Sequence, residues 1–134
     1  MSDIRDHVGS LAQRNPVFVA PGETLRKAAN KLWVESVGAL VVGDAHHPSG
    51  VISERDVVAQ LAQGADPDTM TAEEAMTNYL ISARPGGPLF DVAAQMLDDA
   101  IRHIPIVDEN GDIVGMVSVR DLLRPLLLDA LGGG

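Results

Sequence analysis

The chain has 134 residues, of which 46% are hydrophobic and only 3% aromatic, and its 19 acidic and 10 basic residues give a formal net charge of -9. This length fits one compact body with an aliphatic core, and the negative charge disfavours binding to nucleic acid. The absence of cysteine excludes disulfides and thiolate metal sites. The start "MSDIRDHVGS" has no signal-peptide pattern and no apolar run is long enough to span a membrane, so we expect a cytoplasmic protein.

The sequence repeats itself at an offset of 64 residues. The segment "VAPGETLRKAANKLW" aligns with "ARPGGPLFDVAAQML". A short strand is predicted near the start of each segment, at 17–19 and 80–82. Apolar residues at i, i+3, i+4, i+7 and i+8 predict an amphipathic helix in both copies. These residues are Leu25, Ala28, Ala29, Leu32 and Trp33 in the first copy, and Leu89, Val92, Ala93, Met96 and Leu97 in the second. We expect Trp33 in the core or in an interface.

Each predicted helix is followed by two aliphatic runs with a turn between them. The runs are "VGALVVG" and "GVIS" in the first copy and "RHIPIVD" and "IVGMVS" in the second, and each pair predicts a β-hairpin. The second turn is one residue longer, which changes the offset to 65. A closing helix then begins at Ser53 or Ser118. Each copy thus has the order β-α-β-β-α in a mixed α+β fold, and the two copies are expected to pack about a pseudo-twofold axis to bury their sheets.

The linker between the copies is predicted from helix-breaking residues in "QGADPDTMTAEEAM". We assign residues 1–65 to the first repeat with an N-terminal helix. Residues 66–134 form the second repeat, with the linker, a short helix entering this repeat, and a C-terminal helix. Together they are expected to form one module.

This organisation resembles a tandem pair of cystathionine-β-synthase-type (CBS) domains, the Bateman module. The resemblance covers roughly residues 10–128 and rests on two β-α-β-β-α units that each end in G-h-h-S-x-x-D-h-h, where h is apolar: "GVISERDVV" at 50–58 and "GMVSVRDLL" at 115–123. It implies a regulatory module that binds an adenine nucleotide (AMP, ADP or ATP) in the cleft between its repeats. It also implies a homodimer.

The repeated serine and aspartate have two interpretations. Ser53 with Asp56, and Ser118 with Asp121, have the spacing of a helix capping box, which alone explains both residue types. A helix N-terminus also accepts an anion, and a carboxylate there can accept hydrogen bonds from vicinal hydroxyls. The resemblance implies that the two aspartates bind ribose and that the two serines lie near the phosphate.

The remaining motif residues are the glycines Gly50 and Gly115 and the arginines Arg55 and Arg120, which capping does not explain. Contact with a phosphate and pairing with neighbouring acids such as Glu54 are equal alternatives for the two arginines.

The resemblance implies two nucleotide pockets of unequal composition. The Asp56 pocket would hold adenine against small residues and receive two cations from the other repeat; its members are Asn15, Pro16, Val17, Val37, Gly38 and Ala39, with Arg102 and His103 opposite. The Asp121 pocket would consist of Tyr79, Leu80, Ile81, Arg102, His103 and Ile104, with Gly38 and Ala39 opposite. Because only the first has basic partners, we expect nucleotide to bind in the Asp56 pocket.

No motif of an enzyme is present: the sequence lacks a G-x-S-x-G element, an H-E-x-x-H pair and a phosphate-binding G-x-x-x-x-G-K-[ST] loop. His46 and His47 are expected to be solvated turn residues, so no metal is expected. Nucleotide binding would then change the shape of the module. This change would act on an effector protein in trans or alter the assembly state.

The alternative function is that of a structural or dimerisation module with vestigial nucleotide pockets. The C-terminal helix favours it, because its leucines exceed what one repeat needs to fill its core, and an apolar helical face at a chain end suggests a second copy as partner. These leucines are Leu122, Leu123, Leu126, Leu127, Leu128 and Leu131. Pro125 is expected to kink or restart this helix.

Overall fold

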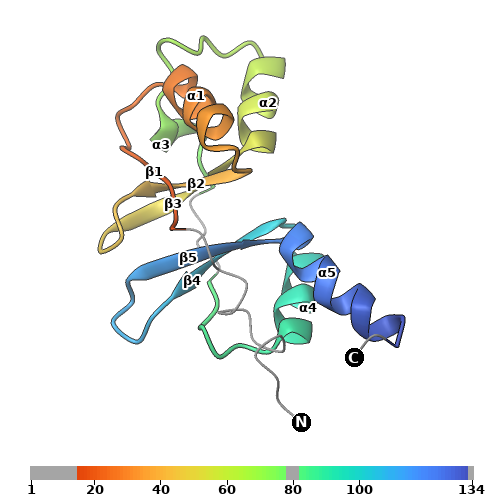
Figure 1. The fold of residues 1–134 in the computed structure, drawn as a ribbon. Coiled ribbons are helices and arrows are strands. Elements are labelled where there is room, and N and C mark those ends of the chain that lie inside the picture. The colour runs from red at the N-terminus through yellow and green to blue at the C-terminus, as the bar shows by residue number, and fades with distance from the viewer. Residues whose placement is uncertain (1–14, 78–81, 133–134) are drawn as a thin grey trace. The chain divides into compact units, whose positions relative to one another are not determined.

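The computed structural model describes residues 15–77 and 82–132, which divide into two compact units (Figure 1). The first unit holds residues 16–77, and the second holds residues 82–132 together with Asn15. Both contain helices and strands, so the predicted mixed α+β class is confirmed. The expected N-terminal helix, Tyr79, Leu80, Ile81 and most of the strand expected at 80–82 lie outside the described residues.

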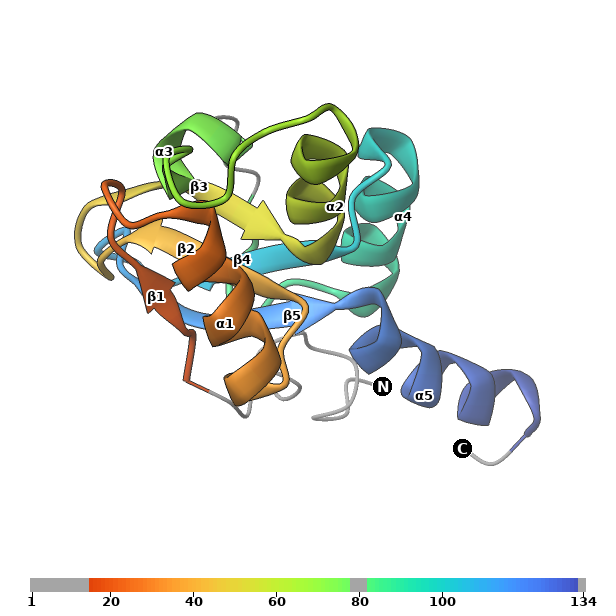
Figure 2. The same cartoon turned by 90° about the horizontal axis from the view of Figure 1, so that it is seen from above.

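The first unit is a three-stranded sheet covered on one face by helices (Figures 1 and 2). Its elements are β1 (Phe18–Val19), α1 (Leu25–Glu35), β2 (Ala39–Gly43), β3 (Pro48–Ser53), α2 (Glu54–Ala62) and α3 (Ala72–Ala75). The strand order is β1-β2-β3, with β1 parallel to β2 and β3 antiparallel to β2. This is the predicted order β-α-β-β-α followed by one short helix.

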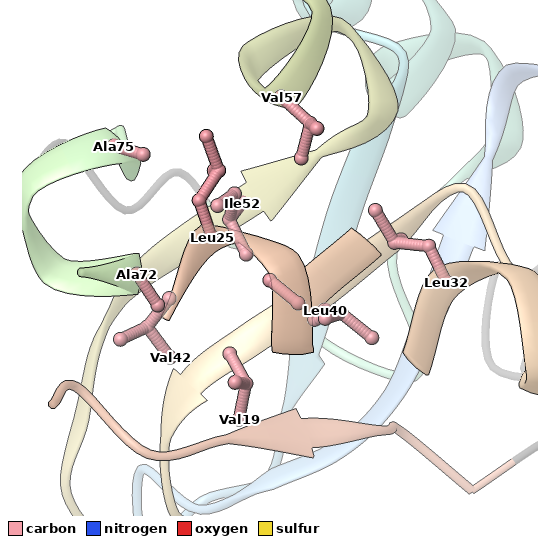
Figure 3. Packing of buried hydrophobic residues seen from close by; sticks show 10 residues of the cluster. Val19, Leu25, Leu32, Leu40, Val42, Ile52, Val57, Ala72 and Ala75 are labelled. Atoms are coloured by element: carbon pink, nitrogen blue, oxygen red, sulfur yellow. The ribbon is translucent and has the colours of Figure 1, made fainter. Parts of the chain in front are cut away.

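The core of the first unit lies between this sheet and its helices (Figure 3). Leu40 and Val42 on β2 and Ile52 on β3 pack with Leu25 of α1 and Val57 of α2. Side chains alternate between the two faces of a strand, so these residues share the helix-covered face. The aliphatic runs of the sequence therefore supply the core, as predicted.

The second unit repeats this plan with α4 (Leu89–Asp99), β4 (His103–Val107), β5 (Ile113–Ser118) and α5 (Val119–Ala130). β4 and β5 form an antiparallel hairpin, and Ala83 makes a parallel bridge with Ile106, as β1 does with β2 in the first unit. The first hairpin turn spans 44–47 and the second spans 108–112. The second turn is one residue longer, which confirms the predicted cause of the change in offset.

Helix α3 packs on the first unit, whereas the sequence predicts a short helix that enters the second repeat. Ala72 and Ala75 belong to the first hydrophobic core, and the N–H of Ala72 donates to the carbonyl of Glu23 at 2.7 Å. Thr77 continues this contact, because its N–H donates to the carbonyl of Val51 at 2.9 Å. The apolar side chains of the short helix fill the end of the first core, so the segment belongs to that unit.

Trp33 does not enter the core and is 84% exposed, so a core position for it was wrong. An α-helix turns about 100° per residue, so position i+7 lies about 20° from position i, but i+8 lies about 80° away. Leu32 therefore stays on the buried face with Leu25, and Trp33 turns outward. Leu97 occupies the equivalent position of α4 and is 82% exposed for the same reason.

Helix α5 continues through Pro125 without restarting. A proline inside a helix removes one backbone hydrogen bond, and Pro125 itself is buried. Leu122 enters the second core and Leu126 packs against it. Other leucines of the helix are exposed, as expected from the sequence; these are Leu123, Leu127 and Leu128, and Leu131 just after the helix is exposed as well. No helix in residues 15–77 or 82–132 has the length and apolar character needed to cross a membrane.

Candidate functional site

The first candidate half-site lies where β3 ends and α2 begins. Ser53 is the N-cap of α2: its Oγ accepts from the N–H of Asp56 at 3.2 Å, and Oδ2 of Asp56 accepts from the N–H of Ser53 at 2.8 Å. The N–H of Glu54 donates to the carbonyl of Gly38 at 3.0 Å, which ties the start of the helix to the start of β2. The capping interpretation of this motif is therefore confirmed.

Capping occupies only one oxygen of the Asp56 carboxylate. Oδ2 accepts both from the N–H and from the hydroxyl of Ser53, at 2.8 and 2.9 Å. Within the part of the chain that the structure describes, Oδ1 of Asp56 has no hydrogen-bond partner. The same side chain can thus cap the helix and still accept a hydrogen bond from another molecule. The two interpretations of the motif are compatible.

The other candidate residues of the first unit lie at the same edge of the sheet. Ala39 is directly opposite Ser53 in the β2–β3 pairing. β1 runs parallel to β2 with Phe18 opposite Val41, and the carbonyl of Val17 accepts from the N–H of Val41 at 2.9 Å. Residues 16 and 17 therefore approach the edge at which Gly38 and Ala39 begin β2, whereas Asn15 is grouped with the second unit. Val17 and Val37 differ from the others because the side chains of both pack against the hydrophobic core.

The second unit builds the same geometry around Ser118. Oδ2 of Asp121 accepts from the N–H of Ser118 at 2.8 Å, and Oγ of Ser118 accepts from the N–H of Asp121 at 3.2 Å. His103 lies opposite Ser118 in the β4–β5 pairing, and the N–H of Val119 donates to the carbonyl of Arg102 at 2.8 Å. Arg102 and His103 thus take the places that Gly38 and Ala39 take in the first unit.

Ile104 contributes no accessible side chain to this second half-site. It is fully buried in the second hydrophobic core, because the alternation of β4 turns it to the face opposite that of His103. Only the backbone of Ile104 remains for contact with a ligand.

Arg55 and Arg120 lie in the first turns of α2 and α5, and both are exposed. In the described residues neither makes an ion pair, so the expected alternative of pairing with Glu54 is not seen. Their guanidinium groups remain available to a ligand that reaches the N-terminus of either helix.

The repeated glycine has a structural role in the first unit that the sequence did not indicate. A Cβ atom on Gly50 would lie 2.3 Å from the carbonyl oxygen of Thr77 and 2.9 Å from Sδ of Met76. The segment that follows α3 thus crosses directly over Gly50. Only a residue without a side chain allows this approach.

The two adjacent histidines belong to a turn held together by Asp44. Oδ1 of Asp44 accepts from the N–H groups of His46 and His47, at 2.9 and 2.7 Å. The hydrogen bond from the backbone of His47 is the main cause that lowers the pKa of Asp44 below its usual value. Across the described part of the chain, no three acidic or histidine side chains come close enough together to hold a metal ion.

Both halves of the chain match a known family. The family model of the CBS domain matches residues 8–63 and again residues 72–128. The chain belongs to the CBS domain family. The two matches to CBS domains lie on the two repeats and include both S-x-x-D motifs.

Similar CBS proteins include relatives of known structure. The CBS domain protein PAE2072 from Pyrobaculum aerophilum, complexed with AMP, is 32% identical, with a TM-score of 0.84 over 94% of this chain and 98% of that chain. The CBS domain pair of protein MJ0100, in complex with 5-methylthioadenosine and S-adenosyl-L-methionine, is 28% identical, with a TM-score of 0.80 over 95% of this chain and 96% of that chain. Protein MK0525 of Methanopyrus kandleri is 34% identical over 87% of this chain, which spans 61% of the length of that relative.

Proposed function

We propose that this protein is a regulatory module that binds an adenine nucleotide and is not itself an enzyme. The observation that carries the proposal is the state of the two carboxylates: each caps its own helix through Oδ2, and Oδ1 has no partner among the described residues. A free carboxylate oxygen beside a helix N-terminus can accept a hydrogen bond from a ribose hydroxyl. The backbone N–H groups at the same helix N-terminus favour the binding of a nearby phosphate.

Solved relatives support the choice of an adenosine compound. PAE2072 is complexed with AMP, and the MJ0100 pair with 5-methylthioadenosine and S-adenosyl-L-methionine. All these ligands contain adenine and a ribose. We expect the small residues Gly38 and Ala39 to contact the adenine and the carboxylate of Asp56 to bind the ribose. The AMP complex belongs to a protein 32% identical to this chain, so a nucleotide is our first choice.

We expect AMP, ADP or ATP to raise the melting temperature of the protein. A ligand that binds only the native state stabilises it by RT ln(1 + [L]/Kd), which is about 2.7 kcal/mol at a hundredfold excess over Kd. For a chain of this size that free energy corresponds to a rise of roughly 10 °C. Differential scanning fluorimetry with each nucleotide at millimolar concentration measures it.

The matched controls are GMP, which keeps the ribose phosphate, and S-adenosyl-L-methionine, which keeps adenosine but lacks phosphate. A larger shift with AMP than with either control supports an adenine nucleotide. A melting temperature that none of these compounds changes contradicts nucleotide binding and favours the alternative of a purely structural module.

We further propose that the protein is a homodimer that signals to an effector protein or through its assembly state. Exposed apolar side chains on α5 and just after it favour self-association, among them Leu127 at 55% and Leu131 at 81% exposure. Light scattering at micromolar concentration is expected to give about twice the chain mass of 14.1 kDa. A mass of one chain at high micromolar concentration would contradict this part of the proposal.

A further inference from the structure

Strand β1 is the end strand of the sheet in the first unit, and part of the first half-site lies immediately before it. The carbonyl of Val17 accepts from the N–H of Val41 on β2. Successive residues of a strand direct their backbone groups to opposite sides, so Phe18 and Ala20 direct theirs away from β2. Such outward groups of an end strand need other partners or stay open to water and to other chains.

Two charged side chains bind these outward groups. Nζ of Lys31, on α1, donates to the carbonyl of Phe18 at 2.7 Å. Oε1 of Glu23, just before α1, accepts from the N–H of Ala20 at 3.0 Å. Nζ and Oε1 are 3.5 Å apart, so one ion pair holds the outer edge of β1 at two points. We call this arrangement the Lys31–Glu23 clamp.

The clamp differs from an ion pair on an open surface. The side chains of Lys31 and Glu23 are 31% and 29% exposed, whereas those of the pair Arg26–Asp68 are 65% and 61% exposed. The hydrogen bond from the N–H of Ala20 is the main cause that lowers the pKa of Glu23 below its usual value, so this carboxylate is charged at neutral pH. Hydrogen bonds to charged groups are stronger than those between neutral groups, and partial burial reduces their screening by solvent.

The clamp is not repeated in the second unit. At the offset of 64 residues, Gly87 stands in the place of Glu23 and Gln95 in the place of Lys31, so neither charge is present. In the described part of this unit, the equivalent of β1 is a single bridge at Ala83. The two repeats therefore differ in how the strand that leads into the sheet is held.

We propose that the Lys31–Glu23 clamp positions the segment 16–17 for the bound nucleotide. This segment leads directly into Phe18, whose carbonyl the clamp binds, and it approaches the edge at which β2 begins. A binding surface that is already held in place loses less conformational freedom when the ligand binds, which raises the affinity. The two side chains act through the backbone of β1 and are positioning residues. This inference rests on the proposed binding of an adenine nucleotide.

The affinity for AMP is the first test of this role. Lys31→Met keeps a side chain of similar length but removes the donor to the carbonyl of Phe18. We expect this variant to bind AMP about tenfold more weakly than the wild-type protein. Lys31→Arg keeps a positive charge with N–H donors and is expected to regain most of the lost affinity. Calorimetric titration measures both variants.

Two matched controls separate positioning from charge. Lys27→Met removes the same charge from an exposed position of the same helix, and Gln95→Met makes the equivalent change in the second unit. Both are expected to bind AMP as the wild type does. A loss in Lys27→Met equal to that in Lys31→Met would overturn the proposal in favour of a general attraction between positive charge and phosphate. Wild-type affinity in Lys31→Met would also overturn it.

Amide hydrogen exchange without nucleotide is the second test. The N–H of Val41 donates to the carbonyl of Val17, so its exchange rate reports directly on the segment 16–17. In Lys31→Met and in Glu23→Gln we expect faster exchange at Val41, while Ile52 on β3 keeps its rate. An equal increase at Val41 and Ile52 would assign the clamp to overall stability alone. Unchanged exchange at Val41 would show that the clamp does not hold this segment.

The failure of this inference can be distinguished from the failure of the proposed function. Titration of the wild type with AMP, ADP and ATP tests the function before any variant is compared, and no binding of any of them would contradict both. Nucleotide binding by the wild type together with wild-type affinity in Lys31→Met and Glu23→Gln would contradict the positioning role alone.

Discussion

Replacing Gly50 by alanine is expected to lower the free energy of unfolding by about 1 to 3 kcal/mol, the usual range for an overpacked site. The added Cβ would lie 2.3 Å from the carbonyl oxygen of Thr77. That carbonyl cannot simply move away, because Thr77 and Val51 exchange two backbone hydrogen bonds, at 2.9 and 3.3 Å. We therefore expect the segment after α3 to separate from β3, with a melting temperature lower by roughly 4 to 11 °C.

Gly22→Ala is the matched control for this prediction. Nothing lies within 4 Å of a Cβ built on Gly22, and its backbone does not adopt a positive φ. Alanine there is expected to change the free energy of unfolding by less than about 0.5 kcal/mol, or to raise it slightly by restricting the unfolded chain. Chemical denaturation of both variants compares them, and equal effects would contradict the close approach at Gly50.

The reason for Gly50 could not be predicted from the sequence, although the repetition of "GVISERDVV" and "GMVSVRDLL" made the glycine conspicuous. The side chain that would clash at Gly50 meets a backbone atom of Thr77, which lies 27 positions later. Local pattern shows which positions repeat, but a close approach of two distant segments depends on the tertiary fold.

The order of the elements could be predicted because it depends on local periodicity. The capping motif predicted that the closing helices begin at Ser53 and Ser118, and both caps are present. The exposure of Trp33 did not follow, because the i+8 position lies at the margin of an apolar stripe and packing decides whether it is buried. The packing of the short helix α3 on the first unit did not follow either, because four residues of helix carry no signal for the core that receives them.

The candidate site could be predicted in its residue types and less well in their orientation. The spacing placed Ser53 and Asp56 in one motif, the resemblance to CBS pairs added Gly38 and Ala39, and strand pairing brings all four to one sheet edge. It did not show that Ile104 points into the core, because the face of a strand depends on its register. Nor did it show that each aspartate uses Oδ2 alone for capping.

The Asp56→Ala variant is expected to bind AMP at least tenfold more weakly than the wild-type protein. A hydrogen bond to a charged group is worth about 1.5 to 3 kcal/mol, and 1.4 kcal/mol corresponds to a factor of ten in affinity. Asp121→Ala is expected to have a much smaller effect. The positions beside Asp56 hold the small residues Gly38 and Ala39, whereas the equivalent positions beside Asp121 hold Arg102 and His103. Calorimetric titration of both variants measures the difference.

Because both aspartates also cap their helices, each alanine variant is expected to lose stability as well, by about 0.5 to 2 kcal/mol. Asp56→Asn separates the two effects: its amide oxygen still accepts from the N–H of Ser53, but the negative charge that strengthens a bond to the ribose is gone. We expect this variant to melt close to the wild type without ligand and yet to bind AMP more weakly. Wild-type affinity in Asp56→Asn and Asp56→Ala would assign the carboxylate to capping alone. A loss confined to Asp121→Ala would place the nucleotide at the second half-site.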